Sequence, residues 1–165
     1  MTKHSLAGVF AALWLAGCSD KPIVQPIPFN HRIHAANEVT CDYCHVHALD
    51  GQRASLPRVS LCMDCHDSDI TKNPDAAPFV ALICQTAKAG SELPWVRLYE
   101  LPHHVYFSHR RHTTIAGFKC DVCHGDMGSR ESPPTAQVGR PLDMNDCLDC
   151  HDANGVGREC TWCHR

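Results

Sequence analysis

The chain has 165 residues, a formal net charge of −3 and 20% charged side chains, together with 12 cysteines and 13 histidines. This charge excludes a basic field for binding nucleic acid. Only 3 Trp, 3 Tyr and 5 Phe are present, so aromatic side chains supply little core. In a chain this small we therefore expect crosslinks or metal ligation to hold much of the fold.

The N-terminus predicts export. Lys3 and His4 precede an apolar run, Leu6 to Leu15, which is too short to span a bilayer and is typical of a secretory signal. The run ends in Leu-Ala-Gly-Cys, which resembles the lipobox of bacterial lipoproteins, with cleavage before Cys18. We expect residues 1–17 to be a lipoprotein signal peptide and Cys18 to be lipidated. The alternative is an ordinary signal peptide with a coincidental cysteine.

Residues 18–28 are rich in proline and predict an extended tether between the lipid and the folded domain. This places the protein on the periplasmic side of a bacterial membrane, held there by its N-terminal lipid. Ser19 stands where the usual inner-membrane retention signal has Asp. That favours the outer membrane only weakly, so the choice between inner and outer membrane stays open.

The first half contains two Cys-x-x-Cys-His motifs. The segment Phe29-Asn30-His31-Arg32-Ile33-His34 is followed, seven positions after His34, by Cys41-x-x-Cys44-His45, and then by Cys62-x-x-Cys65-His66. Cysteines at this spacing can each form a thioether to one vinyl group of a haem, while the adjoining histidine binds one face of the iron. Zinc ribbons instead pair one CxxC with another and need no histidine there. Zinc and disulfide frameworks are the alternatives.

The stretch from Asp67 to Leu101 separates the two halves. It contains Pro74, Pro78 and Pro94 and one short apolar piece, Phe79 to Ile83, so we expect mostly loop with one or two helical turns. Cys84 belongs to no motif, and we interpret it as an incidental or buried thiol. A redox or ligand role is the alternative.

The second half repeats the pattern of the first and adds a motif. Phe107-Ser108-His109-Arg110-Arg111-His112 precedes three motifs, Cys120-x-x-Cys123-His124, Cys147-x-x-Cys150-His151 and Cys160-x-x-Cys163-His164. Repeats at this scale predict two similar units stacked together, 29–101 with two haems and 102–165 with three. We expect a mostly irregular fold with short α-helices, organised around five covalently bound haem c groups.

Each iron needs a second axial ligand or an open face. Outside the motifs the mature chain has seven histidines, and the two His-x-x-His pairs can each reach two different haems from one helix. We assign His31, His34, His109 and His112 as distal ligands, with His104 as the best fifth. The other candidates are His47, His103 and Met144, which lies three residues before Cys147.

The Phe-x-His-x-x-His and CxxCH pattern resembles the class III multihaem cytochromes c. Longer stretches are similar to the pentahaem subunit of quinol:cytochrome c oxidoreductase, known as alternative complex III, and to the multihaem subunit of related quinone reductase complexes. They include IPFNHRIHAANEVTCDYCH, LPWVRLYELPHHVYFSHRRH and RPLDMNDCLDCH. The resemblance covers about Pro26 to His164. It implies distal roles for His31, His34, His104, His109 and His112, and a polysulfide-reductase-type membrane subunit that binds quinol as partner. Subunits of this family usually carry a transmembrane anchor, whereas this sequence predicts a lipid.

We therefore expect a pentahaem lipoprotein that carries electrons between a membrane quinol- or quinone-linked oxidoreductase and periplasmic redox partners, with no catalytic residue of its own. One alternative is a freestanding lipid-tethered electron shuttle. Another is a multihaem reductase in which one haem keeps an open face. Five irons with two histidines each favour electron transfer over a reductase.

Overall fold

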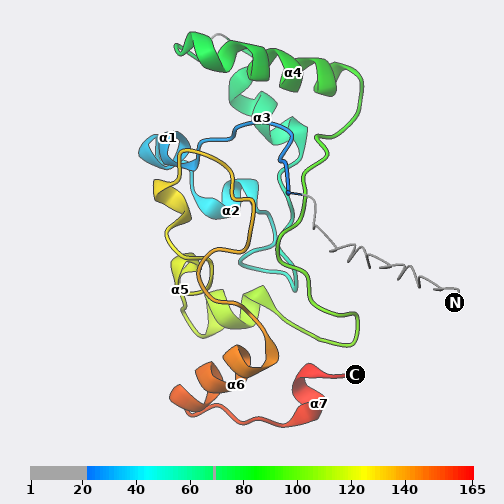
Figure 1. The fold of residues 1–165 in the computed structure, drawn as a ribbon, viewed down its shortest axis with the longest axis vertical. Helices are drawn as coiled ribbons and strands as arrows, with labels where there is room; N and C mark the ends of the chain where they lie inside the picture. The colour runs from blue at the N-terminus through cyan, green and yellow to red at the C-terminus, as the bar shows by residue number, and fades with distance from the viewer. Residues whose placement is uncertain (1–21, 69) are drawn as a thin grey trace, which may run out of the picture.

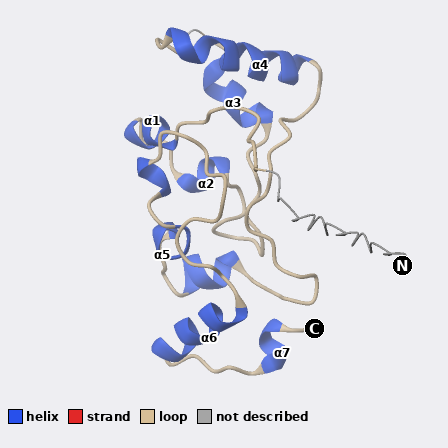
Figure 2. Cartoon of the chain, viewed as in Figure 1, coloured by secondary structure: helices blue, strands red, loops and turns tan. Residues whose placement is uncertain are grey.

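The computed structural model describes residues 22–68 and 70–165, so the expected signal peptide and Cys18 lie outside the described residues. The chain forms short helices joined by long loops (Figure 2). The α-helices are α1 His31–Ala36, α2 Cys41–Cys44, α3 Val59–His66, α4 Ala77–Lys88, α5 Cys120–His124, α6 Met144–Ala153 and α7 Cys160–Cys163. Single turns of 3₁₀-helix, η1 Pro74–Ala76 and η3 Met127–Ser129, and a π-helix, η2 Arg111–Ile115, complete the set.

The helices follow one another along an elongated body. From one end to the other lie α4, α3, α2, α5 and α6, with α7 beside α6 (Figure 1). Among the described residues there is no strand, and the β-pairing is one isolated antiparallel bridge between Val105 and His164. The expected irregular, mostly helical architecture is confirmed. Within the same residues no helix is both long and apolar enough to cross a membrane.

The hydrophobic core is small and lies at one end, between α3 and α4. Its buried members are Ile27, Val59, Ile83 and Leu93. Phe29, Met63 and Trp95 pack around them. None of the described side chains is fully buried, and 14 large hydrophobic side chains are exposed. A core of this size cannot by itself offset the conformational entropy of a chain this long.

The expectation of a mostly looped stretch between the halves is wrong in one respect, because it contains α4, the longest helix. Asn73 caps η1 through its side chain, and Pro78 lies in the first turn of α4, where a missing N–H costs nothing. The helix then buries Ile83 against α3 and ends before Gly90, which has a φ of 63°. Pro74 and Pro78 therefore lie in the first turns of helices.

The π-helix accounts for a difference in length between the two halves. His112 and Cys120 are eight positions apart, whereas His34 and Cys41 are seven apart. The turn that follows His112 closes through Ala116 N–H and Arg111 O at 2.9 Å, five residues apart, as in a π-helix. A π-turn absorbs one extra residue, so both motifs begin in equivalent positions.

Candidate functional site

Each Cys-x-x-Cys-His motif lies on a helix. The motif begins the helix in α2, α5 and α7, ends it in α3, and lies in the middle of α6. One helical turn brings cysteines three positions apart to the same side. In every motif at least one of the two cysteines is only partly covered, and Cys41, Cys65, Cys120 and Cys160 are exposed. The thiols are therefore placed together for attachment to one group.

The histidines of the motifs face histidines from elsewhere in the chain. Ring centroids are 6.3 Å apart for His34 and His66, 6.4 Å for His109 and His124, 6.2 Å for His112 and His151, and 5.5 Å for His104 and His164. A bond between an imidazole nitrogen and a metal ion is about 2 Å long. Two imidazoles on opposite sides of one iron therefore have centroids about 6 Å apart.

The remaining motif histidine, His45, is near His31. Burial lowers the pKa of His31 to about 4, and the nearby His45 is the next largest cause. The two halves also match in sequence, since His31 corresponds to His109 and His45 to His124. Nδ1 of His31 is buried without a hydrogen-bond partner. All five histidines predicted as distal ligands thus lie near a motif histidine.

Four of these ten imidazoles have a backbone carbonyl next to Nδ1. That atom lies 2.8 Å from Asn30 O in His34, 2.8 Å from Ser108 O in His112, 3.0 Å from Ser55 O in His45 and 3.1 Å from Gln52 O in His109. Since a carbonyl only accepts, these contacts place the proton on Nδ1 in His34, His45 and His112, and Nε2 keeps its lone pair for a metal. In His109 the contact with Gln52 O favours the same tautomer. Burial also lowers the pKa of His66, His109 and His124, which favours the neutral, ligating form.

Neighbouring thiols give the order of the motifs in space. Burial raises the pKa of Cys120 and neighbouring Cys41 raises it further, which links the third motif to the first. Burial and then Cys44 raise the pKa of Cys62, and burial and then Cys150 raise that of Cys123. For Cys147 the causes are burial, Asp146 and then Cys163. The motifs therefore follow the order second, first, third, fourth and fifth, as their helices do in Figure 1.

Side chains other than the motif cysteines and histidines connect and support the motifs. Tyr43 in the first motif donates its hydroxyl to Asp64 in the second at 2.7 Å. Tyr99 meets His124 edge-on at 4.6 Å and accepts a hydrogen bond from Val138 N–H at 2.7 Å. Tyr99 could not be predicted from the sequence, because a single aromatic residue in a long loop carries no pattern.

The other ligand candidates lie apart from these pairs. His47 is turned to Asp50, with Nδ1 and Oδ1 3.0 Å apart, and its side chain is 64% exposed. His103 is exposed. Met144 is 61% exposed at the first position of α6. The thiol of Cys84 lies 3.5 Å from the carbonyl oxygen of His66.

These residues fit haem c better than zinc. In residues 22–68 and 70–165 no three His, Cys, Asp or Glu side chains gather to hold a metal ion. The histidines meet instead in pairs at a separation suited to two axial ligands, each pair beside a pair of thiols.

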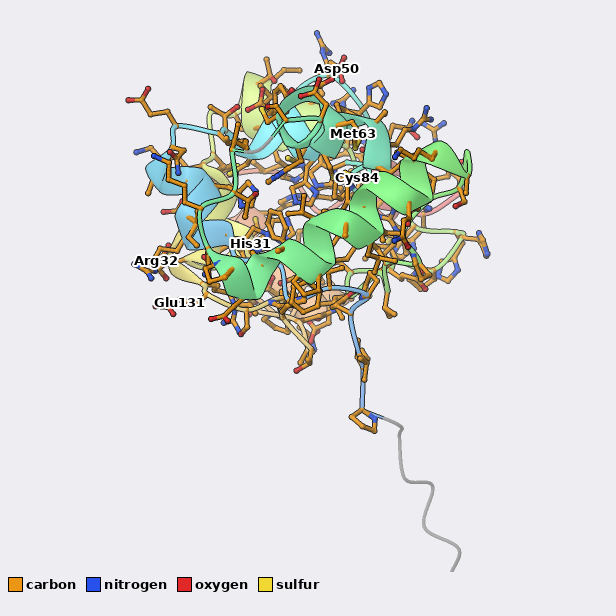
Figure 3. All side chains as sticks on the ribbon, turned by 90° about the horizontal axis from the view of Figure 1, so that it is seen from above. His31, Arg32, Asp50, Met63, Cys84 and Glu131 are labelled. Carbon is orange, nitrogen blue, oxygen red and sulfur yellow. The ribbon has the colours of Figure 1, made fainter. Side chains whose placement is uncertain are left out.

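Figure 3 shows that the ion pair of Arg32 and Glu131 lies at the edge of the molecule, with His31 farther inside.

Comparisons with known proteins cover both halves. Residues 15–91 match the model of the class III cytochrome C family, and residues 105–165 match that of cytochrome c7 and related cytochrome c. A curated relative from Nitratidesulfovibrio vulgaris (strain Hildenborough) is described as the multiheme cytochrome c subunit of menaquinone reductase. It is 29% identical over 164 aligned positions, which cover 86% of this chain and 77% of the relative.

Proposed function

This chain is a multihaem cytochrome c of the class III type, and on that basis we propose that it is the pentahaem electron-transfer subunit of a quinone-linked membrane oxidoreductase. It exchanges electrons between a membrane partner that binds quinol or quinone and redox proteins on the periplasmic side. When bound, haem c supplies reversible one-electron Fe(III)/Fe(II) chemistry. The polypeptide provides attachment, ligands and spacing.

The pairing of histidines is the observation that carries this proposal. We assign the axial pairs His31 with His45, His34 with His66, His109 with His124, His112 with His151 and His104 with His164, supported by four of the ring separations and by the proximity of His45 to His31. The cysteines next to each motif histidine form the thioethers. With two protein ligands for every iron, no face is left for a substrate, which favours a carrier of electrons over a reductase.

The order of the motifs supports a linear path. Attachment sites that succeed one another along the body allow electrons to pass between neighbouring groups from α3 at one end to α7 at the other. The two ends are the second and fifth motifs, so partners exchange electrons there. The expected lipid on Cys18 and the tether 18–28 would keep this path close to a membrane.

The relative supports a quinone-linked partner for this chain. That protein is a subunit of a menaquinone reductase, and a similar complex here would contain a polysulfide-reductase-type subunit that binds the quinone. The lipobox-like Leu-Ala-Gly-Cys before the tether specifically favours a second arrangement, in which the cytochrome is a freestanding shuttle held only by its lipid.

Two measurements test the proposal. The purified holoprotein should carry five haems per chain, and its dithionite-reduced form should not bind carbon monoxide, because every iron has two histidines. Carbon monoxide binding to the wild-type protein would favour the reductase. Haem-stained native gels of gently solubilised membranes, analysed by mass spectrometry, identify the assembly. A large band with a polysulfide-reductase-type subunit supports the complex, whereas a small band alone indicates the shuttle.

A further inference from the structure

The loop at residues 46–52, which follows the first haem motif, meets the helix of the second half that carries His109. The backbone N–H of His109 donates to Gln52 O at 3.1 Å, and that of Arg110 donates to Gly51 O at 3.0 Å. Thr113 Oγ1 donates to Ala48 O at 2.8 Å, and Thr114 Oγ1 donates to Leu49 O. Four carbonyls of one loop thus accept from one turn and a half of the neighbouring helix.

The loop 46–52 has a defined shape of its own. His47 has a φ of 70°, and its carbonyl accepts from Gly51 N–H at 3.0 Å. A Cβ at Gly51 would lie 2.7 Å from the Cβ of His47 and 3.0 Å from its carbonyl oxygen, so the turn has room only for glycine. Ala48 is buried. A loop closed in this way can act as a fixed support.

The same loop faces the imidazole of His109. Nδ1 lies 3.1 Å from Gln52 O and 3.2 Å from the N–H of Ala54. These two partners select different tautomers, because the carbonyl needs a proton on Nδ1 and the amide needs a lone pair there. Ligation through Nε2 requires the proton on Nδ1, so Gln52 O is the partner of the ligating form.

In the first half the corresponding helix, α1, packs against η3 with fewer hydrogen bonds. Arg32 N–H of this helix donates to Arg130 O at 3.0 Å, the one such backbone bond among the described residues, and Nδ1 of His31 has no partner. Ala35 and Ala36 stand where the second half has Thr113 and Thr114. Alanine cannot donate, so the hydroxyl contacts belong to the second half only.

We propose that the loop 46–52 and Gln52 O position His109, so that the loop behind the first haem motif sets the distal ligand of the third. This rests on the proposed function, in which His109 binds the iron held at Cys120 and Cys123. Because the loop directly follows the first motif, attachment there is coupled through it to ligation in the second half. Thr113 is a positioning residue, because it acts through the loop and the helix and not on the iron.

The test is Thr113→Val in the full-length holoprotein. This change keeps the shape of the side chain and removes the donor to Ala48 O and to His109 O. We expect five attached haems and a shift in one of the five low-spin signals in the electron paramagnetic resonance spectrum of the oxidised protein. Thr113→Ser should restore that signal. Thr86→Val is the matched control, since Thr86 donates only within α4, to Leu82 O at 2.8 Å.

A pair of glycine variants tests the loop directly. Gly51→Ala should shift the same signal as Thr113→Val, because the new Cβ must displace the turn. Gly128→Ala, in the loop after the third motif, should shift none, since its Cβ would lie 3.8 Å from the nearest atoms. If Thr113→Val releases a haem, mass spectrometry of haem peptides should identify the Cys120–Cys123 peptide as the one affected.

The outcomes separate this inference from the proposed function. A wild-type protein without five low-spin signals contradicts the proposed ligation before any variant is made. A normal wild-type spectrum that neither Thr113→Val nor Gly51→Ala changes overturns the positioning role alone. Loss of a haem other than that of the third motif overturns it as well.

Discussion

The imidazole of His34 stacks on the ring of Phe29, with centroids 4.4 Å apart and planes inclined by 23°. The same ring meets His31 edge-on at 4.7 Å. Phe107 repeats this arrangement, stacked on His112 at 4.5 Å and edge-on to His109 at 4.9 Å. One phenylalanine therefore holds two imidazoles in place, which explains why each His-x-x-His pair is preceded by Phe.

We predict that Phe29→Leu destabilises the holoprotein by about 1–2 kcal/mol, through the lost aromatic contacts and some lost packing. Two of the five low-spin haem signals should shift, because both imidazoles lose their support. Denaturant unfolding and electron paramagnetic resonance measure the two effects. Phe79→Leu is the control, because Phe79 is 37% exposed and lies on α4, outside the His-x-x-His segments. Equal effects of the two changes would contradict the proposal that Phe29 holds the two imidazoles in place.

Replacing a distal histidine should open one iron. In His34→Ala we expect five attached haems, one of them high-spin and able to bind carbon monoxide after reduction, because His66 remains as the single protein ligand. His103→Ala should bind none, since His103 is exposed and belongs to no pair. Optical titration with carbon monoxide measures the difference. Binding by His103→Ala, or none by His34→Ala, would reverse the assignment.

The sequence predicted which histidines come together, but not the order of the motifs along the body. The motifs, the His-x-x-His pairs and His104 are readable because covalent attachment and ligation demand residue types at short, fixed spacings. The spatial order of the motifs is not readable, because it depends on contacts such as Cys41 beside Cys120, which are 79 positions apart in the chain. Helix α4 differs from the expected loop because proline, which is typical of loops, favours a helix when it lies in the first turn, as Pro78 does.

The carbonyls that hold the imidazoles could not be predicted either. Gln52 O acts through its backbone, so no side-chain pattern marks it. Backbone hydrogen bonds also join the two halves, from Arg32 N–H to Arg130 O and from His109 N–H to Gln52 O. Both cross the predicted boundary at residue 101. The role of Gly139 could not be predicted either, because it depends on the close approach of two segments of the chain.

Gly139→Ala should damage the third motif. Gly139 has a φ of 84°, and a Cβ there would lie 2.5 Å from the nitrogen of Gly125 and 2.6 Å from the carbonyl oxygen of Cys123. Both are backbone atoms next to His124, so the loop must move, at a cost of about 3 kcal/mol. We expect lower thermal stability and incomplete attachment at this motif, measured by calorimetry and intact mass.

Gly155→Ala is the matched control for Gly139→Ala. Gly155 has a φ of 66° but no atom within 4 Å of the added Cβ, so only the strain of a left-handed residue remains, about 1–2 kcal/mol. Complete attachment is expected in this variant. If both variants lose stability equally, backbone strain and not the contact with the third motif explains the effect.

Acid should weaken the fold in a defined range of pH. Burial and the nearby His45 lower the pKa of His31 from its ordinary 6.5 to about 4, so between these values the unfolded chain binds a proton that the native chain does not. The free energy of unfolding therefore falls as pH decreases from 6.5 through 4 and is unaffected by this group above 6.5. The lowered pKa values of His66, His109 and His124 act in the same direction.

Denaturant unfolding at a series of pH values checks this dependence. Carboxylates titrate mainly near and below pH 4, so a loss that begins close to pH 6.5 is characteristic of the histidines. Ligation through Nε2 also needs the neutral imidazole, so the low-spin haem spectrum should persist for as long as the chain stays folded. Stability that stays constant down to pH 4, or that begins to fall above pH 7, would show that these imidazoles do not control the acid transition.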